Sequence, residues 1–294
     1  MNTELDFGKF HITFLDNLKS LTDGGTLFGP VPRAVWNRKF PVDNHNRIPQ
    51  VIDPILLQYE GQNILIDTGL GTSKLNEKQM RNGGIAEEAR LIDSLAEAGL
   101  KPEEVDTVIM THMHNDHAGG LTTLVDGELK STFPEAKIYI NNIEWDEVTH
   151  PNRRTAGTYL KENWEPVQDQ VETWEDTFKV NDAITLHHTG GHSNGHSILL
   201  IEQDGEELIM LADLLLTTAH RNPLWVPAVD DYPMDSIAAK EKWFKYAYEN
   251  NCQFLFYHNP FHVLAKFDEE GKNIIGTQKR QKESLVPNND VFTI

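Results

Sequence analysis

The sequence is poor in cysteine, in basic residues and in long apolar runs. Its 294 residues include one cysteine, Cys252, which excludes an intrachain disulfide and a paired-cysteine zinc knuckle. Lys and Arg total 26 against 45 Asp and Glu, a net charge of -19, and such an acidic surface argues against a nucleic-acid partner. No run of about 18 apolar residues occurs, so we expect no membrane partner. Residues 1–6 lack the basic start and apolar run of a secretory leader, which predicts a cytoplasmic protein.

Histidine, in contrast, is concentrated in one short segment. Residues 111–120 read Thr-His-Met-His-Asn-Asp-His-Ala-Gly-Gly, so three histidines and one aspartate lie within six positions. Neutral imidazoles and carboxylates are the ligands that zinc and its divalent neighbours bind. The spacing His-x-His-x-Asp-His therefore predicts half of a metal site, whose other half must come from elsewhere in the chain.

Apolar runs and amphipathic segments alternate along the chain, which predicts strands interspersed with helices. We expect helices over 85–98, 143–148 and 159–171, and a further helix to about residue 250 that Asp235 or Ser236 would cap. A tail hairpin is expected around Glu270-Gly271. The predicted strands cover 10–15, 54–59, 63–66, 107–110, 137–140, 184–188, 197–202, 207–211 and 254–257.

Four of the predicted strands lead into a residue of a metal-binding type. These residues are His112, His192, Asp213 and His258. Strand ends along one edge of a sheet bring side chains that are distant in sequence to a common rim, on rigid elements. The four are therefore expected to meet in one site.

In type and order these residues resemble those of the metallo-β-lactamase superfamily. The likeness covers nearly the whole chain and implies an α+β fold, a four-layer αβ/βα sandwich with a dinuclear metal site at one edge of the two sheets. It also implies a single domain over residues 1–294, of which residues 1–50 contribute a strand and an aromatic, proline-rich loop. The motifs that carry it are Asp67-Thr68-Gly69, the cluster His112 to His117, Gly191-His192, Asp213 and His258.

The resemblance implies a role for each residue of the site. Two divalent ions are expected per chain, with Zn²⁺ the first choice and Mn²⁺, Co²⁺ or Fe²⁺ as alternatives, because selectivity depends on geometry and supply. Asp67 and His196 would lie behind the ligands and orient or support them. The implied ligands are His112, His114 and His192 for the first metal, Asp116, His117 and His258 for the second, and Asp213 for both.

Longer segments resemble a narrower group, the YtnP-like quorum-quenching lactonases, relatives of N-acyl homoserine lactonases. The group implies a small-molecule lactone or ester as substrate, and a homodimer is compatible with it. Two ions about 3.5–4 Å apart would share a hydroxide, and this hydroxide is expected to attack the lactone carbonyl. Asp116 would orient this nucleophile and pass its proton to the leaving alkoxide. The segments include Asp23-Gly24-Gly25, residues 187–193, residues 219–225 and residues 230–234.

Other functions remain open at this point. A phosphotriesterase or arylesterase of the same fold would use the same hydroxide on a different centre, and a relative without turnover would only bind the signal. A glyoxalase II-type thioesterase is less favoured, because no helical C-terminal domain with a basic clamp is evident. Nucleases of this superfamily usually carry a basic surface, and flavodiiron enzymes usually place Glu at the position of His114.

The substrate contacts are predicted less sharply. In the best-known acyl homoserine lactonases a tyrosine three residues after the bridging aspartate contacts the lactone, and here that position is Leu216. Carbonyl activation would then fall to the metals, with His220 as a further candidate. Phe28, Trp36 and Trp225 either line an apolar acyl pocket or pack as ordinary large aromatics.

Overall fold

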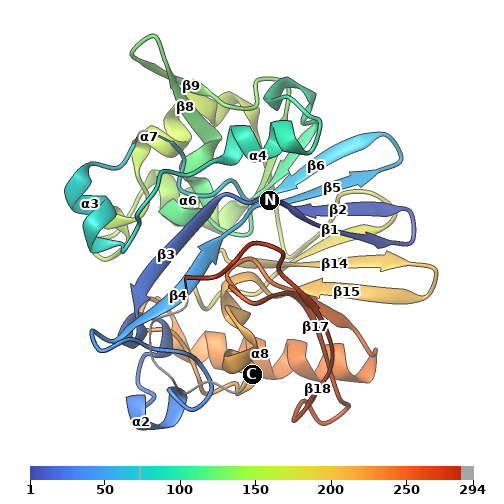
Figure 1. Ribbon diagram of the computed structural model, residues 1–294. Helices are drawn as coiled ribbons and strands as arrows, with labels where there is room; N and C mark the ends of the chain where they lie inside the picture. Colours follow the sequence, from blue (N-terminus) through green and yellow to red (C-terminus); the bar gives the residue numbers. More distant parts are fainter. Residues whose placement is uncertain (73, 286–294) are drawn as a thin grey trace.

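The computed structural model describes residues 1–72 and 74–285. Two seven-stranded sheets lie face to face (Figure 1). The helices α4 (Leu91–Glu97), α6 (Asn142–Thr149) and α7 (Lys161–Trp164) lie on the outer side of one sheet, and α8 (Pro233–Glu249) lies on the outer side of the other. The α+β, four-layer αβ/βα sandwich that the sequence implies is thus confirmed. Within the described residues, no helix combines the length and apolar character needed to cross a membrane.

Both sheets are mixed. In the first sheet the three pairings that join β1 to β6 are antiparallel and the three that join β6 to β11 are parallel. Across that sheet the strands are β1 (Thr3–Phe7), β2 (Phe10–Phe14), β5 (Ile55–Tyr59), β6 (Gln62–Ile66), β7 (Thr107–Ile109), β10 (Lys137–Asn141) and β11 (Val171–Trp174).

The second sheet is antiparallel except at β15–β16, which pair in parallel. Its strands are β12 (Thr177–Lys179), β13 (Ile184–His188), β14 (Ser197–Gln203), β15 (Glu206–Met210), β16 (Gln253–Leu255), β17 (His262–Phe267) and β18 (Ile274–Lys279). The turn between β17 and β18 contains Gly271, which confirms the predicted tail hairpin. Two small ribbons pair β3 (Leu18–Asp23) with β4 (Arg47–Ile52) and β8 (Thr122–Val125) with β9 (Glu128–Ser131).

The helices are short except for α8. The α-helices are α1 (Gly24–Phe28), α2 (Arg33–Trp36), α3 (Glu77–Asn82), α4 (Leu91–Glu97), α5 (Asn115–Ala118), α6 (Asn142–Thr149), α7 (Lys161–Trp164) and α8 (Pro233–Glu249). The 3₁₀-helices are η1 (Pro102–Glu104), η2 (Gly119–Leu121), η3 (Thr155–Gly157), η4 (Glu165–Gln170), η5 (Ala212–Leu215) and η6 (Thr218–Arg221).

Apolar side chains fill three layers between these elements. The central layer joins the inner faces of the two sheets, for example Ile12 and Ile66 from the first and Leu186 and Leu199 from the second, all essentially inaccessible to solvent. A second cluster lies between the first sheet and α4, and a third lies under α8. Burying this apolar area drives the sandwich together and leaves the strand ends free to carry polar residues.

Three helix predictions were wrong in extent. Of residues 85–98 only Leu91–Glu97 are helical, because the Arg90 backbone amide donates to Asn17 instead of continuing a helix. Residues 159–171 form α7 and the 3₁₀ turn η4, with Pro166 in the first turn of η4, where its missing N–H ends the α-helical ladder. The last helix begins at Pro233, a residue pre-set for a first turn, rather than after a cap at 235 or 236.

A buried ion network ties the C-terminal part of the chain to its N-terminal part. Asp53 accepts hydrogen bonds from Arg280 Nη1 at 2.7 Å and Lys282 Nζ at 2.5 Å, and all three side chains are almost inaccessible. Arg280 also donates to the carbonyls of Phe256 and Asn259, at 2.9 Å and 2.8 Å, which lie on either side of residue 258. The network therefore holds the loop after β16.

Removing one partner of this network should be costly. In Asp53→Asn the buried Arg280 guanidinium loses its carboxylate, and we expect the free energy of unfolding to fall by about 3–5 kcal/mol in urea denaturation at pH 7. The control is Glu60→Gln, which breaks the exposed Lys9–Glu60 pair and should leave the midpoint unchanged. Equal midpoints for Asp53→Asn and wild type would contradict this role.

Candidate metal centre

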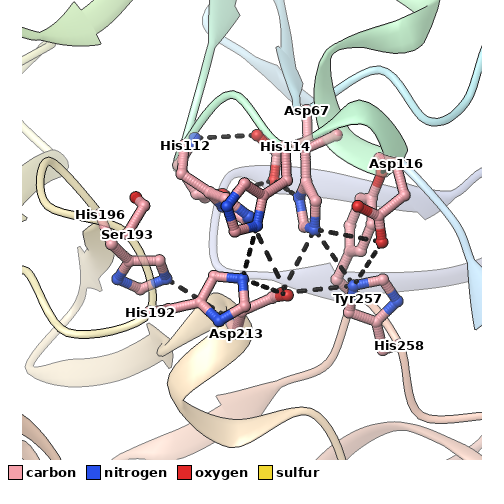
Figure 2. Close-up of polar contacts among 12 residues, drawn as sticks. Asp67, His112, His114, Asp116, His192, Ser193, His196, Asp213, Tyr257 and His258 are labelled. Atoms are coloured by element: carbon pink, nitrogen blue, oxygen red, sulfur yellow. Dashed lines mark hydrogen bonds and ion pairs between the residues drawn. The ribbon is translucent and has the colours of Figure 1, made fainter. Parts of the chain in front are cut away.

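Seven histidine and aspartate side chains meet where four strands end. His112, His114, Asp116 and His117 follow β7, and α5 carries the last two. His192 follows β13, Asp213 lies in η5 directly after β15, and His258 follows β16. Figure 2 shows Asp213 between His192 on one side and His258 on the other. The predicted convergence of strand ends is therefore what the fold produces.

The ligand atoms form three overlapping groups, each within 4.8 Å. Their members are the seven residues that the family resemblance implies as ligands. The groups are His112, His114 and His192; His112, His117 and Asp213; and Asp116, His117 and His258.

Distances within the groups show nitrogen facing nitrogen. His114 Nδ1 lies 2.9 Å from His192 Nε2, and His117 Nε2 lies 3.1 Å from His258 Nε2. Asp213 Oδ1 is 3.3 Å from both His117 Nε2 and His258 Nε2, while Asp213 Oδ2 is 3.1 Å from His192 Nε2. One carboxylate therefore faces both histidine pairs, as a ligand bridging two cations must.

These residues fit divalent ions. The Nε2 atom of His112 is buried and has no hydrogen-bond partner, and the same is true of the Oδ1 atom of Asp213. A buried polar atom without a partner needs an explanation, such as a bound ion. Burial lowers the pKa of His112 and of His114 well below the usual value, so both rings are neutral and offer a lone pair. An all-nitrogen and oxygen donor set suits zinc, manganese, cobalt or iron.

The pKa values of the other site residues reflect the shared carboxylate. Burial alone lowers the pKa of His192, but Asp213 and Asp230 oppose it and raise the value to about 10. Burial would raise the pKa of Asp213, but the histidines around it, His117 first, hold it well below its usual range. Asp213 is therefore the anion around which the cluster is organised.

Asp67 fixes one ring of the cluster from behind. It is fully buried and accepts hydrogen bonds at 2.8 Å from His117 Nδ1, from the Thr111 amide and from Thr111 Oγ1. The proton of His117 is thereby placed on Nδ1, which leaves Nε2 free toward His258. Asp67 adopts φ 54, a strained region for a residue other than glycine.

His196 supports Asp213 from below. Its Nε2 accepts the Asp213 amide N–H at 3.3 Å, and its Nδ1 donates to Thr189 Oγ1 at 2.8 Å. This network assigns the proton of the ring to Nδ1, in keeping with burial that lowers its pKa well below the usual value.

Three further supporting groups were missed from the sequence. His192 Nδ1 donates to buried Asp230 at 2.8 Å, and His258 Nδ1 donates to the Val51 carbonyl at 2.8 Å. Tyr257 stacks on His117 with ring centres 4.5 Å apart and donates from its hydroxyl to the Asp116 carbonyl. Asp230 lies in one of the quoted segments, but nothing in its local sequence pairs it with residue 192.

The site opens into a cavity of about 460 Å³. His114, Asp116, His192 and Asp213 form its floor, and the Asp116 side chain is 32% exposed there. The walls are mixed, with Leu27, Leu216, Ala228 and Val229 among the apolar residues, and Thr22, Thr26, Gln50, Arg154, Thr155, Thr158 and Asp231 among the polar ones.

Of the five expected substrate contacts, all within the described residues, Leu216 alone is among the residues that line this cavity. Phe28 is fully buried and stacks between Trp36 and His220, with ring centres 4.6 Å apart on each side. Trp225 meets the edge of Phe28 at 5.9 Å. His220 donates from Nε2 to the Leu27 carbonyl at 2.9 Å, and burial lowers its pKa to about 3. The stack thus supports the cavity wall, and the geometry favours the packing alternative that the sequence left open.

Comparison with known proteins agrees with this architecture. The sequence model of the metallo-beta-lactamase superfamily matches residues 48–246. The chain belongs to this superfamily. An N-acyl homoserine lactonase of Bacillus sp is 30% identical over 165 residues, 53% of this chain and 60% of that protein, so the chain spans less than two thirds of the curated relatives that it first matches.

Two solved structures are similar over nearly the whole chain. A probable metal-dependent hydrolase from Staphylococcus aureus is 38% identical, with a TM-score of 0.90 over 95% of this chain and 99% of that one. AidC, described as a dizinc quorum-quenching lactonase in complex with the product N-hexanoyl-L-homoserine, is 18% identical, with a TM-score of 0.76 over 99% and 98%. The second likeness is one of fold.

Asp67 offers a test of how the rings are held. In Asp67→Asn the His117 ring loses the carboxylate that fixes its proton on Nδ1, and we expect metal affinity to fall by about 10–100-fold. Zinc retained against graded chelator, measured by mass spectrometry, would report this. Asp93→Asn, at a position 74% exposed, is the control that should match wild type. Wild-type retention in a folded Asp67→Asn protein would refute the role.

Proposed function

We propose that this protein is a two-metal hydrolase that opens lactone rings, with N-acyl homoserine lactones as its substrates. The observation that carries the proposal is the shared carboxylate: Asp213 lies within 3.3 Å of ring nitrogens of His117, His192 and His258, at the floor of an open cavity. Such a donor set suits two zinc ions. His112, His114 and His192 would bind one ion, and Asp116, His117 and His258 would bind the other.

Relatives support the substrate class. The curated relatives with the stronger matches are described as N-acyl homoserine lactonases, and the AttM lactonase of Rhizobium radiobacter, 21% identical, extends the match to 70% of this chain. A cavity of about 460 Å³ also lies in the range of small-molecule sites.

In the proposed mechanism the bound ions supply Lewis acidity and a nucleophilic oxygen at neutral pH. Asp116 is the residue that moves the proton. Its carboxylate lies 3.6 Å from His258 Nε2 and 3.9 Å from His117 Nε2, and it faces the cavity, so it can take a proton from the nucleophile and return it to the leaving alkoxide.

The cavity walls orient the substrate around this proton transfer. Leu27 and Leu216 offer an apolar surface near the floor, whereas Thr22, Thr26, Thr155 and Thr158 offer hydroxyl groups. Leu216 has no donor for the scissile carbonyl, and both ring nitrogens of His220 are engaged, by Thr217 and Leu27. Carbonyl polarisation is therefore left to the metal-binding side of the cavity.

The proposal is tested by ring opening of an N-acyl homoserine lactone, followed as proton release. The zinc-loaded wild type should turn over, and chelation or His114→Ala should reduce kcat/KM by at least about 1000-fold, or about 4 kcal/mol in activation free energy. Asp116→Asn also alters a candidate ligand of the second ion. Assayed at saturating zinc with both ions counted, it should still lose about 10²–10⁴-fold in kcat, the usual contribution of a positioned proton carrier.

Each contrary result has a defined meaning. A protein that holds two ions and leaves lactones intact would refute lactone hydrolysis, and the same samples would then be tested with aryl esters and phosphotriesters. Turnover of those substrates alone would assign the alternative enzyme activity. Tight lactone binding with no turnover of any of the three would assign a signal-binding role.

The cavity mouth predicts selectivity for substrate size. Arg154 lines the cavity with its side chain 58% exposed to solvent. It donates to the Asp231 carboxylate and to the Ala228 and Asp230 carbonyls, the last two at 3.2 Å and 3.0 Å. Arg154→Ala should widen the mouth and raise the ratio of kcat/KM for long over short acyl chains by about tenfold, or about 1.4 kcal/mol. Arg153→Ala removes the neighbouring exposed arginine, which is not among the lining residues, and should leave the ratio unchanged. An unchanged ratio in a metal-loaded Arg154→Ala protein would contradict this.

A further inference from the structure

A buried carboxylate outside the seven ligand-type residues joins the two loops that carry His112, His114 and His192. Glu144, in α6, is inaccessible to solvent and accepts four hydrogen bonds from neutral donors. Its Oε1 accepts from the Met113 amide at 2.7 Å and the Tyr159 hydroxyl at 3.0 Å. Its Oε2 accepts from Ser193 Oγ at 2.6 Å and the Gly195 amide at 3.1 Å.

The donors are placed directly beside the candidate ligands. Met113 lies between His112 and His114, and Ser193 follows His192, so Glu144 holds the backbone next to all three residues of one ligand group. The approach at residue 195 is also close. A Cβ added to Gly195 would lie 2.1 Å from the Glu144 backbone nitrogen, so only glycine allows the loop this near to α6.

This arrangement addresses a specific difficulty of the first ligand group. His114 Nδ1 and His192 Nε2 face each other at 2.9 Å although their loops are 78 residues apart in sequence. At this distance the two nitrogens can share a proton, whereas a bound cation would require both to present a lone pair to it, so both loops must hold the rings in place without that shared proton. A single acceptor shared by both loops does so, because four hydrogen bonds converge on it.

We propose that Glu144 is a positioning residue that preorganises the ligand group formed by His112, His114 and His192. Glu144 has no hydrogen bond to the residues unique to the second group, Asp116 and His258, among the contacts of the described chain. Its loss should therefore weaken one metal position and spare the other. The inference rests on the proposed metal ligands and not on the identity of the substrate.

The test is zinc retention by the full-length, zinc-loaded chain in increasing chelator. Wild type should retain two ions per chain. Glu144→Gln keeps the size of the side chain but turns an acceptor into an amide NH₂ facing donors, so one ion should be released at about 10–100-fold lower chelator while the other is retained as in wild type. Asp146→Asn, on the exposed side of α6 with 83% of its side chain accessible, is the control and should retain both ions.

Double variants identify which position is affected. Adding Glu144→Gln to His114→Ala should have no further effect, because both act on the same ion, whereas adding it to His258→Ala should leave neither ion tightly bound. Ser193→Ala and Tyr159→Phe each remove one donor and should weaken the same ion to a smaller extent, which keeps the test usable if Glu144→Gln does not fold. Wild-type retention, or equal weakening of both ions, would overturn the proposal. Because zinc retention involves no substrate, failure to open lactones would refute the proposed function and leave this result untouched.

Discussion

The structure depends on a cluster of ring nitrogens and one shared carboxylate that lie within hydrogen-bond distance of one another at the strand ends. His114 and His192 approach to 2.9 Å and His117 and His258 to 3.1 Å, with Asp213 beside both pairs. For these nitrogens to turn their lone pairs to a common cation, each ring must be fixed from its far side. Asp67, Asp230 and the Val51 carbonyl supply the far-side partners, each at 2.8 Å.

The backbone around the site is shaped by this requirement. Ala212, directly before Asp213, adopts φ 44, which is unfavourable for a residue with a side chain and persists only because the surroundings enforce it. Gly119 and Gly120 show the same pressure, since a Cβ on either would lie 2.1 Å from a backbone oxygen of Leu70 or Thr68. The two glycines of the histidine motif therefore let the segment after Asp67 pack against α5 and η2.

Much of the site could be predicted because its residues occur in short, recognisable sequence motifs. The histidine motif after β7, and single ligands at the ends of three other strands, were recognisable from residue type and position. Glu144 and Asp230 were not, because an acidic residue on a helix or in a loop has no local sign of burial. Glu144 meets Met113, and Asp230 meets His192, only when the two sheets pack together.

The fold shows the same division between local and tertiary information. Long apolar runs such as β14 were predicted almost to the residue, because burial on both faces requires them. Residues 85–90 have a helical pattern, but Ile85 forms a β-bridge with Ser20 and the Arg90 amide donates to Asn17. These are tertiary contacts that periodicity cannot reveal. The aromatic residues Phe28 and Trp36 were recognised as notable, yet whether they face the cavity or the wall behind it depends on how α1 and η6 pack.

The charge of the cavity and of the whole chain favours an uncharged substrate for the proposed reaction. Asp116, Asp213 and Asp231 line the cavity against the single arginine Arg154, which is already paired with Asp231, and the whole chain carries a net charge of -19. Two bound divalent ions would outweigh the carboxylates of the cavity, so the acidic charge acts on a substrate before it reaches the ions, where it repels an anion and leaves a neutral ester or lactone unaffected. Hydrolysis turns the neutral ring into a carboxylate, so the surface that admits the substrate also favours departure of the product. An acidic surface around a cation-binding floor is thus suited to hydrolysing uncharged esters.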